Sequence, residues 1–166
     1  KILGLGYPGG PSIESRALKG NPTSFKLPLP LLKQNNCDMS FSGLKTALRR
    51  EVTKTKNHTG VLSEKAINDL CASFQNAVID IFVDKTQKAM ILFKNSYPTV
   101  PHTIAIAGGV AANKKLGFAL LKIANNFNFN LIRPEPQLCT DNAAMIASAG
   151  SELYLNKIIS TETLIP

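Results

Sequence analysis

The sequence has few of the features that mark membrane-bound or secreted proteins. No apolar run reaches the roughly 18 residues that a membrane-spanning helix needs. The three cysteines, Cys37, Cys71 and Cys139, form neither a close pair nor a CxxC motif, which is typical of a reduced intracellular protein. We therefore expect no membrane association, no disulfide framework and a cytoplasmic location.

Histidine is equally scarce, and this limits the metal chemistry that can be assigned to the chain. Its two histidines, His58 and His102, lie far apart in polar or proline-bounded stretches. An isolated histidine in such a context is normally a surface residue. We expect both at the surface, with no metal-binding pair between them.

Composition and charge are those of a globular domain with an affinity for polyanions. The 166 residues are 44% hydrophobic and 18% charged, enough for one domain with a core. Nineteen basic residues against eleven acidic ones give a net charge of +8, which favours an RNA partner. The aromatic residues are sparse and not interleaved with the basic ones along the sequence. We therefore expect contacts to the RNA backbone more than base stacking.

A glycine pair follows a predicted strand near residue 108. The apolar run Thr103–Ala107 predicts a buried strand, and the residues after Asn113 predict a helix to about Asn125. Gly108 and Gly109 carry no Cβ atoms, so the backbone could lie against a base or a phosphate. Asn113 offers an amide that can donate and accept. An ordinary tight turn between strand and helix explains the same glycines.

A second glycine-rich loop precedes a short helical pattern near the start of the chain. Gly9 and Gly10 lead into Pro11, which suits the first position of a helix predicted over Ser12–Lys19. Gly20 then stands where helices often end. This loop is a second candidate for contact with a nucleotide.

The third junction carries an acid. Pro134-Glu135-Pro136 keeps the chain extended, and Asp141 stands where the chain turns into a helix that begins with small apolar residues. Thr140 or Asp141 could cap that helix. Asp141 could instead be a metal ligand or a catalytic acid, and its position leaves both interpretations open. The run Ala143–Ala149 should let the helix pack close to a neighbour.

The remaining elements follow from hydrophobic periodicity and turn residues. We expect a long amphipathic helix capped by Ser63, in which Phe74 and Phe82 belong to the core. The other expected features are an irregular arm over Asn21–Gln34, a short strand over Cys37–Ser42, a helix over Gly43–Val52, a break in the long helix near Val83 and Asp84, and a strand over Phe127–Arg133. The alternation from Thr103 onward predicts an α/β lobe.

Four strings, LGLGYPGGPSIE, MSFSGLKT, IAGGVAANKKL and CTDNAAMIA, occur in this order. They resemble the C-terminal half of the TsaD family, the catalytic subunits of tRNA threonylcarbamoyladenosine synthase. The resemblance covers almost everything from Lys1 to about Leu155. It predicts that residues 1–155 form the C-terminal part of an actin-like ATPase-type transferase and that residues 156–166 form a tail.

The resemblance implies a fold and a reaction. The fold would be a truncated α/β lobe of the actin-like ATPase (ribonuclease-H-like) type, with a mixed sheet and flanking helices. The reaction would move a threonylcarbamoyl group from threonylcarbamoyl-AMP to the exocyclic amine of an anticodon-loop adenosine in tRNA. Bacterial-type accessory subunits would assist. Gly9, Gly10, Gly108, Gly109 and Asn113 would bind the substrate nucleotide.

The resemblance also implies one divalent metal ion, iron or zinc, with Asp141 as a ligand. The family's other ligands are two histidines of an HxxxH helix in its N-terminal half, and nothing in this sequence matches them. We therefore expect the chain alone to be inactive in transfer. Two rival functions stay open: half of a phosphotransferase of the sugar- or acetate-kinase type, and a non-catalytic RNA-binding module.

These three junctions support one hypothesis. Each is a loop that feeds the start of a helix, and the three together would form one wall of an adenylate pocket. The hypothesis requires that Gly10, Asn113 and Asp141 lie near one another in space.

Overall fold

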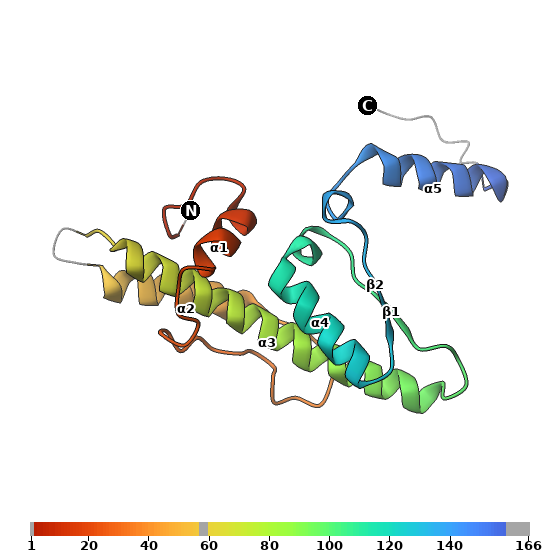
Figure 1. Ribbon diagram of the computed structural model, residues 1–166, viewed down its shortest axis with the longest axis horizontal. Coiled ribbons are helices and arrows are strands. Elements are labelled where there is room, and N and C mark those ends of the chain that lie inside the picture. The colour runs from red at the N-terminus through yellow and green to blue at the C-terminus, as the bar shows by residue number, and fades with distance from the viewer. Residues whose placement is uncertain (1, 57–59, 159–166) are drawn as a thin grey trace.

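The computed structural model describes residues 2–56 and 60–158 and is mostly helical, with one small parallel sheet. A 33-residue helix, α3, forms the spine along which the other elements are arranged (Figure 1). In chain order the elements are α1 (Gly9–Ala17), α2 (Ser42–Thr55), α3 (Glu64–Ser96), β1 (Thr103–Ala105), η1 (Gly109–Ala112), α4 (Lys114–Asn126), β2 (Asn130–Ile132), η2 (Pro136–Leu138) and α5 (Ala143–Leu155).

Helix α3 begins where the sequence predicts it. The Ser63 hydroxyl accepts a hydrogen bond from the Ala66 N–H over 3.2 Å, and Glu64 adds a negative charge to the first turn. The predicted break near Val83 and Asp84 is wrong, because the helix continues to Ser96. No glycine or proline interrupts it, and Asp84 pairs with Lys88 one turn later over 2.7 Å.

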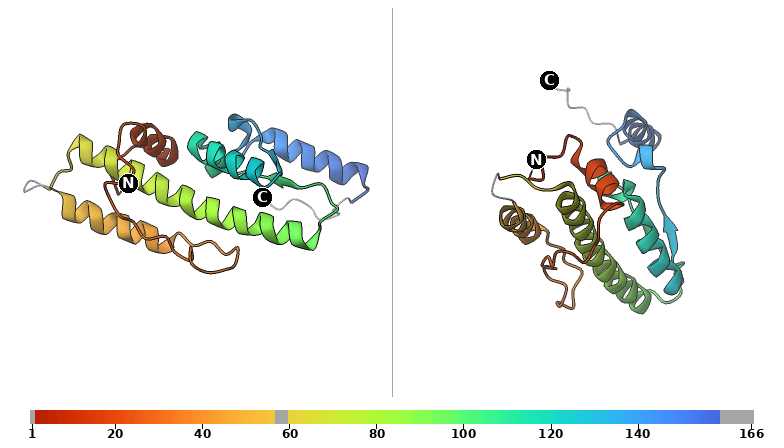
Figure 2. Two further views of the ribbon diagram at one scale, coloured as in Figure 1. Left: turned by 60° about the horizontal axis from the view of Figure 1, so that its bottom comes forward. Right: turned by 60° about the vertical axis from the view of Figure 1, so that its left-hand side comes forward.

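Helices α1 and α4 lie on one side of α3, and α2 lies on the other (Figure 2). The first core joins α1, α2 and the N-terminal half of α3, with Leu44, Leu48 and Leu70 among its buried side chains. Gly20 follows α1 at a close crossing. A Cβ there would collide with the backbone carbonyl of Asn68, so the residue must be glycine.

The irregular arm predicted over Asn21–Gln34 is confirmed, and two lysines of α3 hold its end. The wholly buried ammonium group of Lys85 donates to the carbonyl oxygens of Leu31, Gln34 and Asn36 over 2.6, 2.9 and 3.0 Å. Lys88 adds bonds to the Leu32 and Gln34 carbonyls. Cations of α3 therefore satisfy backbone groups that a loop would otherwise leave without partners.

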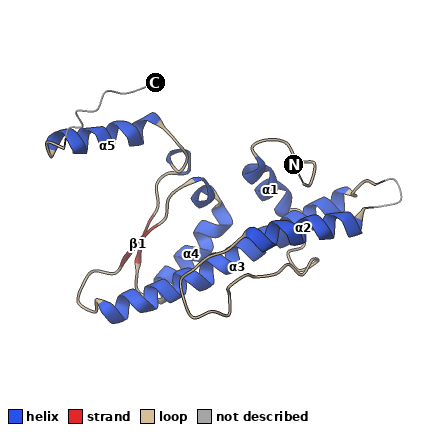
Figure 3. Ribbon diagram, turned by 180° about the vertical axis from the view of Figure 1, so that it is seen from behind, coloured by secondary structure: helices blue, strands red, loops and turns tan. Residues whose placement is uncertain are grey.

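The strand predicted over Cys37–Ser42 is wrong. Residues 37–41 adopt no regular structure, and α2 begins at Ser42. A strand needs a neighbour to pair with, and the strands of the described residues, β1 and β2, pair only with each other (Figure 3). The sequence of residues 37–42 is compatible with an extended chain, but it does not show whether another strand lies beside it to pair with.

The second core belongs to a strand–helix–strand unit. β1 and β2 pair in parallel, with Ile104 opposite Leu131, and α4 packs its buried face on the C-terminal half of α3. The prediction of a mixed sheet is wrong for the described residues, whose sheet has two strands that run parallel. The predicted second strand is shortened to Asn130–Ile132, because Asn128 turns the chain with a φ of 58° and Phe129 is buried in the core.

His102 is not a simple surface residue. Its half-buried ring stacks on Phe129 at a centroid distance of 4.9 Å and meets the ring of Phe93 edge-on at 6.2 Å. The prediction of a surface position is therefore wrong for this histidine, because its ring completes an aromatic cluster at the edge of the second core. His58 lies outside the described residues.

Helix α5 extends away from the rest of the molecule (Figure 1). None of its residues is buried, and Ile146, Tyr154 and Leu155 are 66%, 73% and 73% exposed. The prediction that Ala143–Ala149 packs close to a neighbour is wrong for the described structure. Among the described helices, none combines the length and the apolar character needed to cross a membrane.

Candidate nucleotide-binding site

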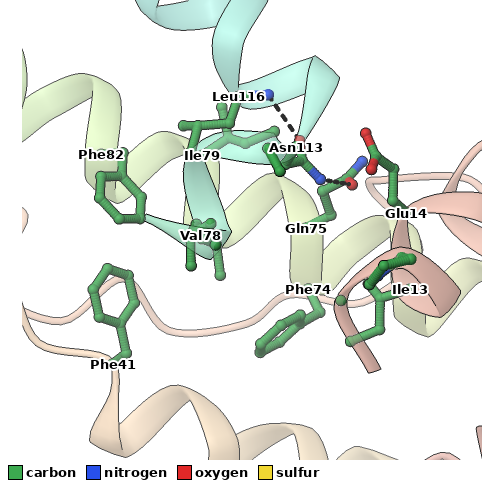
Figure 4. A pocket seen from close by; sticks show the side chains of 15 residues that line it. Ile13, Glu14, Phe41, Phe74, Gln75, Val78, Ile79, Phe82, Asn113 and Leu116 are labelled. Atoms are coloured by element: carbon green, nitrogen blue, oxygen red, sulfur yellow. Dashed lines mark hydrogen bonds between the residues drawn. The ribbon is translucent and has the colours of Figure 1, made fainter. Parts of the chain in front are cut away.

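A cavity of about 540 Å³ lies where α1, α3 and the start of α4 meet. Figure 4 shows its aromatic side chains grouped on one side and its polar side chains on the other. The lining residues are Gly10, Pro11, Ile13, Glu14, Phe41, Phe74, Gln75, Val78, Ile79, Phe82, Gly109, Val110, Ala112, Asn113 and Leu116.

Two of the three predicted junctions therefore share this cavity. Gly10 comes from the first glycine-rich loop, and Gly109 and Asn113 come from the second. The third junction is adjacent: a Cβ on Gly109 would lie 3.9 Å from the Thr140 methyl group. Asp141 itself is exposed and does not line the cavity, so the required proximity holds fully for Gly10 and Asn113 only.

The first junction differs in detail from its prediction. Helix α1 begins at Gly9, with Pro8 in the extended conformation as its N-cap residue, so Pro11 is the third helical residue and not the first. The Ser12 hydroxyl donates to the Pro8 carbonyl over 3.1 Å. Gly9 and Gly10 thus belong to the first turn, where backbone N–H groups have no partner within the helix.

The second junction contains an extra turn. Gly108 has a φ of 87°, a conformation that favours glycine, and the chain then forms the 3₁₀ turn η1 before α4 begins. Strand and helix are therefore not joined directly by the glycine pair. The extra turn places Gly109, Val110 and Ala112 along the cavity wall.

Asn113 is the N-cap residue of α4, and its side chain also bonds a residue of α3. Its Oδ1 accepts from the Leu116 N–H over 2.9 Å, and its Nδ2 donates to Oε1 of Gln75 over 2.8 Å (Figure 4). Gln75 is buried. An amide has two donors and two acceptor lone pairs, so Asn113 keeps capacity for a ligand while its orientation is fixed.

Glu14 also lines the cavity, although no motif in the sequence predicts this. Its Oε1 accepts from the Lys114 N–H over 2.7 Å, which ties α1 to the first turn of α4. A carboxylate also suits the positive end of a helix. The sequence gives little indication of this role, since a single acidic side chain on a short helix normally points into solvent. Gln75 had a clearer signal, because it interrupts the apolar stripe of α3.

Aromatic side chains form the other side of the cavity. Phe41 and Phe82 lie with their ring centroids 5.4 Å apart, and Phe74 lies nearby (Figure 4). Phe74 and Phe82 were predicted as core residues. Both do pack against the cores, but they are only half-buried because their remaining surface faces the cavity.

Cys71, one helical turn before Gln75, is poorly suited to act as a nucleophile. Burial in the first core raises the pKa of its thiol to about 11, so the thiolate that would react is absent at neutral pH. Cys139 is also buried, whereas Cys37 is exposed. All three thiols are free.

The sequence profile of one family, TsaD, described as tRNA N6-adenosine threonylcarbamoyltransferase, matches residues 1–148. The chain belongs to the TsaD family. It is 46% identical over 166 residues to a tRNA N6-adenosine threonylcarbamoyltransferase of Rhodospirillum rubrum and 48% identical over 153 residues to one of Brucella anthropi. A protein of the same name in Rickettsia massiliae is 44% identical over 169 residues.

These alignments cover 100%, 92% and 100% of this chain but only 45%, 42% and 47% of the respective relatives. The TsaD member described here therefore spans about half the length of the curated relatives that it matches. Three of the four strings on which the resemblance rests, LGLGYPGGPSIE, MSFSGLKT and IAGGVAANKKL, contribute residues to the lining of the cavity.

In the fourth string, CTDNAAMIA, the residue that caps the helix is not the one expected. Asn142, and not Thr140 or Asp141, caps α5: its Oδ1 accepts from the Met145 N–H over 3.0 Å, and its Nδ2 donates to the Thr140 carbonyl over 2.8 Å. Asp141 is thus free of the capping role. Within residues 2–56 and 60–158, no three side chains of histidine, cysteine, aspartate or glutamate are grouped as a metal site requires.

Proposed function

We propose that this TsaD member supplies the adenylate-binding part of a tRNA threonylcarbamoyltransferase. The observation that carries the proposal is the shared cavity of Gly10 and Asn113, residues 103 positions apart in the sequence. Its volume of about 540 Å³ lies in the range of small-molecule sites, roughly 300 to 1,000 Å³. Gly9 and Gly108 flank the residues that line it and are included as substrate-binding residues.

The two sides of the cavity suit the two parts of an adenylate. Adenine is flat and apolar on its faces, so we assign it to the side formed by Phe41, Phe74 and Phe82. The ribose hydroxyls would meet the second carboxylate oxygen of Glu14 and the amide of Asn113. The N–H groups in the first turn of α1, at Gly9 and Gly10, then suit the phosphate.

The proposed reaction is an acyl transfer from a mixed anhydride. The exocyclic nitrogen of a tRNA adenosine attacks the carbamoyl carbon, a C–N bond forms, the C–O bond to the phosphate breaks, and AMP leaves as the nitrogen loses a proton. The amine is a weak nucleophile because its lone pair is conjugated with the ring. Fixing the adenylate beside the tRNA base is therefore the main contribution that these residues can make.

The described residues do not form a metal site. Asp141 is a single exposed carboxylate, and tetrahedral or octahedral coordination of zinc or iron needs several ligands. We retain Asp141 as one candidate ligand of an iron or zinc ion and derive no step through a metal. Thr140, the residue before Asp141, is adjacent to Gly109, which supports a position for this candidate ligand at the border of the proposed nucleotide site.

The wider architecture remains part of the proposal. An actin-like lobe over residues 1–155, with residues 156–166 as a tail, is supported by the strand–helix–strand unit and by family membership. Partners would be tRNA, favoured by the net charge of +8, and the accessory subunits of the modification complex.

Nucleotide binding to the 166-residue chain tests the proposal. AMP, the leaving group of the reaction, should perturb the amide NMR signals of Gly10, Gly109 and Asn113, whereas Gly150 on α5 should not respond. Perturbations confined to other regions, or no binding at millimolar AMP, would contradict the assignment. Transfer of a phosphoryl group from ATP to sugars or acetate would favour the kinase-type alternative instead.

A further inference from the structure

The solvent-exposed face of α4 combines positive charge with an exposed aromatic ring. The buried face of this helix, including Leu116, Leu120 and Ala124, packs into the second core. The opposite face presents Lys114, Lys115, Phe118 and Lys122, all exposed. Phe118 has 74% of its surface accessible, which is unusual for a phenylalanine next to a well-formed core.

Helical spacing brings these four side chains together. Lys114 and Lys115 precede Phe118 by four and three residues, and Lys122 follows it by four, so all three lysines neighbour the ring on the helix surface. The expectation that aromatic residues are not interleaved with basic ones is therefore wrong for this face. In the linear sequence two residues separate Lys115 from Phe118 and three separate Phe118 from Lys122, and the helical repeat brings these side chains together.

The charge of this face is poorly balanced. Helix α4 contains three lysines and no acid, whereas α3 contains four lysines and four acids. Two carboxylates of other elements lie close: Glu14 bonds the Lys114 N–H, and Asp80, bonded to Asn76, interacts with Lys115 through space. No carboxylate of the described chain lies within 4 Å of the ammonium groups of Lys114, Lys115 or Lys122.

The face also begins at the nucleotide cavity. Asn113 lines the cavity and caps α4, and Phe118 lies five residues further along the helix. At about 1.5 Å of rise per residue, the ring is roughly 8 Å along the helix axis from the cavity wall. A loop nucleotide stacked on Phe118 would thus lie about one and a half helical turns along α4 from Asn113, on the outer face of the helix.

We infer that the face of Lys114, Lys115, Phe118 and Lys122 is the platform on which the tRNA loop docks. This inference rests on the proposed function and adds where the RNA binds. Phe118 stacks on one unpaired base, while the lysines neutralise the flanking phosphates, a combination that selects single-stranded loops over duplexes. A duplex keeps its bases stacked on each other and can use only the lysines.

The absence of tryptophan from the sequence allows a direct test. The variant Phe118→Trp keeps an aromatic ring and introduces a single tryptophan, whose emission can be excited selectively, at the proposed stacking position. A hairpin RNA with an unpaired, adenosine-containing loop should quench and shift its emission. The matched control is Tyr154→Trp, at a 73% exposed position on α5, which should respond much less. A fully paired RNA of equal length, or polyglutamate, should have little effect on either variant.

Affinity measurements then separate stacking from charge. Phe118→Ala should weaken hairpin binding roughly fivefold to hundredfold at constant salt. The double variant Lys115→Ala/Lys122→Ala should weaken binding and reduce its salt dependence. The double variant Lys45→Ala/Arg49→Ala removes the same charge from exposed positions on α2 and should have a smaller effect. Equal losses from the α2 and α4 pairs, or equal quenching by duplex RNA, would overturn the inference.

AMP binding distinguishes failure of this inference from failure of the proposed function. Phe118→Ala should leave AMP affinity unchanged, because Phe118 does not line the cavity. If the chain binds AMP but hairpin RNA fails to quench Phe118→Trp, only the platform is refuted. If AMP does not bind while the RNA response is as predicted, the adenylate site is refuted and the platform stands.

Discussion

The side-chain amide of Asn113 bonds Oε1 of Gln75 over 2.8 Å and so joins the start of α4 to the middle of α3. Both residues line the cavity, and Gln75 is buried. The glycine-rich loop before α4 is thereby fixed against α3. The wall of the proposed nucleotide site depends on this polar contact, and a buried polar contact is costly to leave half-made.

Removing either partner should therefore destabilise the fold, but by different amounts. Asn113→Ala loses the cap of α4 and the bond to Gln75, and we expect a loss of about 2 kcal/mol in the free energy of unfolding. Gln75→Met keeps the cap and should cost about 1 kcal/mol. Urea denaturation followed by circular dichroism measures both. A Gln75→Met variant that loses more stability than Asn113→Ala would show that the cap is unimportant.

Lys85 and Lys88 both donate hydrogen bonds to backbone carbonyls of the loop, but they differ in burial, so their variants can be compared. Lys85→Met leaves three loop carbonyls without their shared donor in a wholly buried place, so we expect a loss of at least about 2 kcal/mol. The Lys88 side chain is 21% exposed and water can replace its bonds, so Lys88→Met should cost less. Limited proteolysis should also cut residues 31–36 faster in Lys85→Met. Equal stability of the two variants would contradict this account of the loop.

Gly20 should not tolerate any side chain. Gly20→Ala would force its Cβ into the Asn68 carbonyl, and the required shift of α1 against α3 should cost about 1 to 3 kcal/mol. Gly6→Ala is the control, because a Cβ there meets nothing within 4 Å. It should change stability by less than about 0.5 kcal/mol. Thermal unfolding of both variants measures the difference. A melting temperature equal to that of the wild type for Gly20→Ala would contradict the close approach of Gly20 to α3.

Acid should weaken the contact between α3 and the segment after α1. Hydrogen bonds from Lys65 Nζ and the Asn21 N–H, at 2.7 and 2.8 Å, hold the pKa of Asp69 below its ordinary value of 3.8, against the opposing effect of burial. Because the folded state favours the ionised form, this stabilisation is complete above pH 3.8 and is lost as pH falls through the lowered pKa. Asp69→Asn should be less stable than wild type at neutral pH, and the difference should shrink in acid. Unfolding midpoints measured across that pH range give the comparison, and a constant difference would contradict it.

The sequence predicted the helices better than the contacts between them. Ser63 and the repeating apolar positions of α3 are local signals, and they located that helix correctly. Lys85 was missed because a lysine in a helical pattern normally faces solvent, and only the tertiary structure brings three carbonyl groups to it. The strand expected over Cys37–Ser42 failed for the same reason, since pairing depends on a distant partner.

The candidate site was predicted in part. Gly10 and Asn113 meet in one cavity, as the motifs suggested, but Asp141 stays outside it. Asp and Asn are almost equally good N-caps, so the sequence could not show that Asn142 takes this role in place of Asp141. Phe118 was overlooked because its lysine neighbours are adjacent only on the helix surface.

The central claim, that the cavity between α1, α3 and α4 binds an adenylate, is tested most directly by calorimetric titration of AMP into two leucine variants. In both Gly10 and Gly150, a new Cβ meets nothing within 4 Å, and both glycines lie within helices, but only Gly10 lines the cavity. We predict that Gly10→Leu weakens AMP binding at least about tenfold without loss of thermal stability, and that Gly150→Leu binds AMP like the wild type. Equal AMP affinity in Gly10→Leu and wild type would contradict the claim.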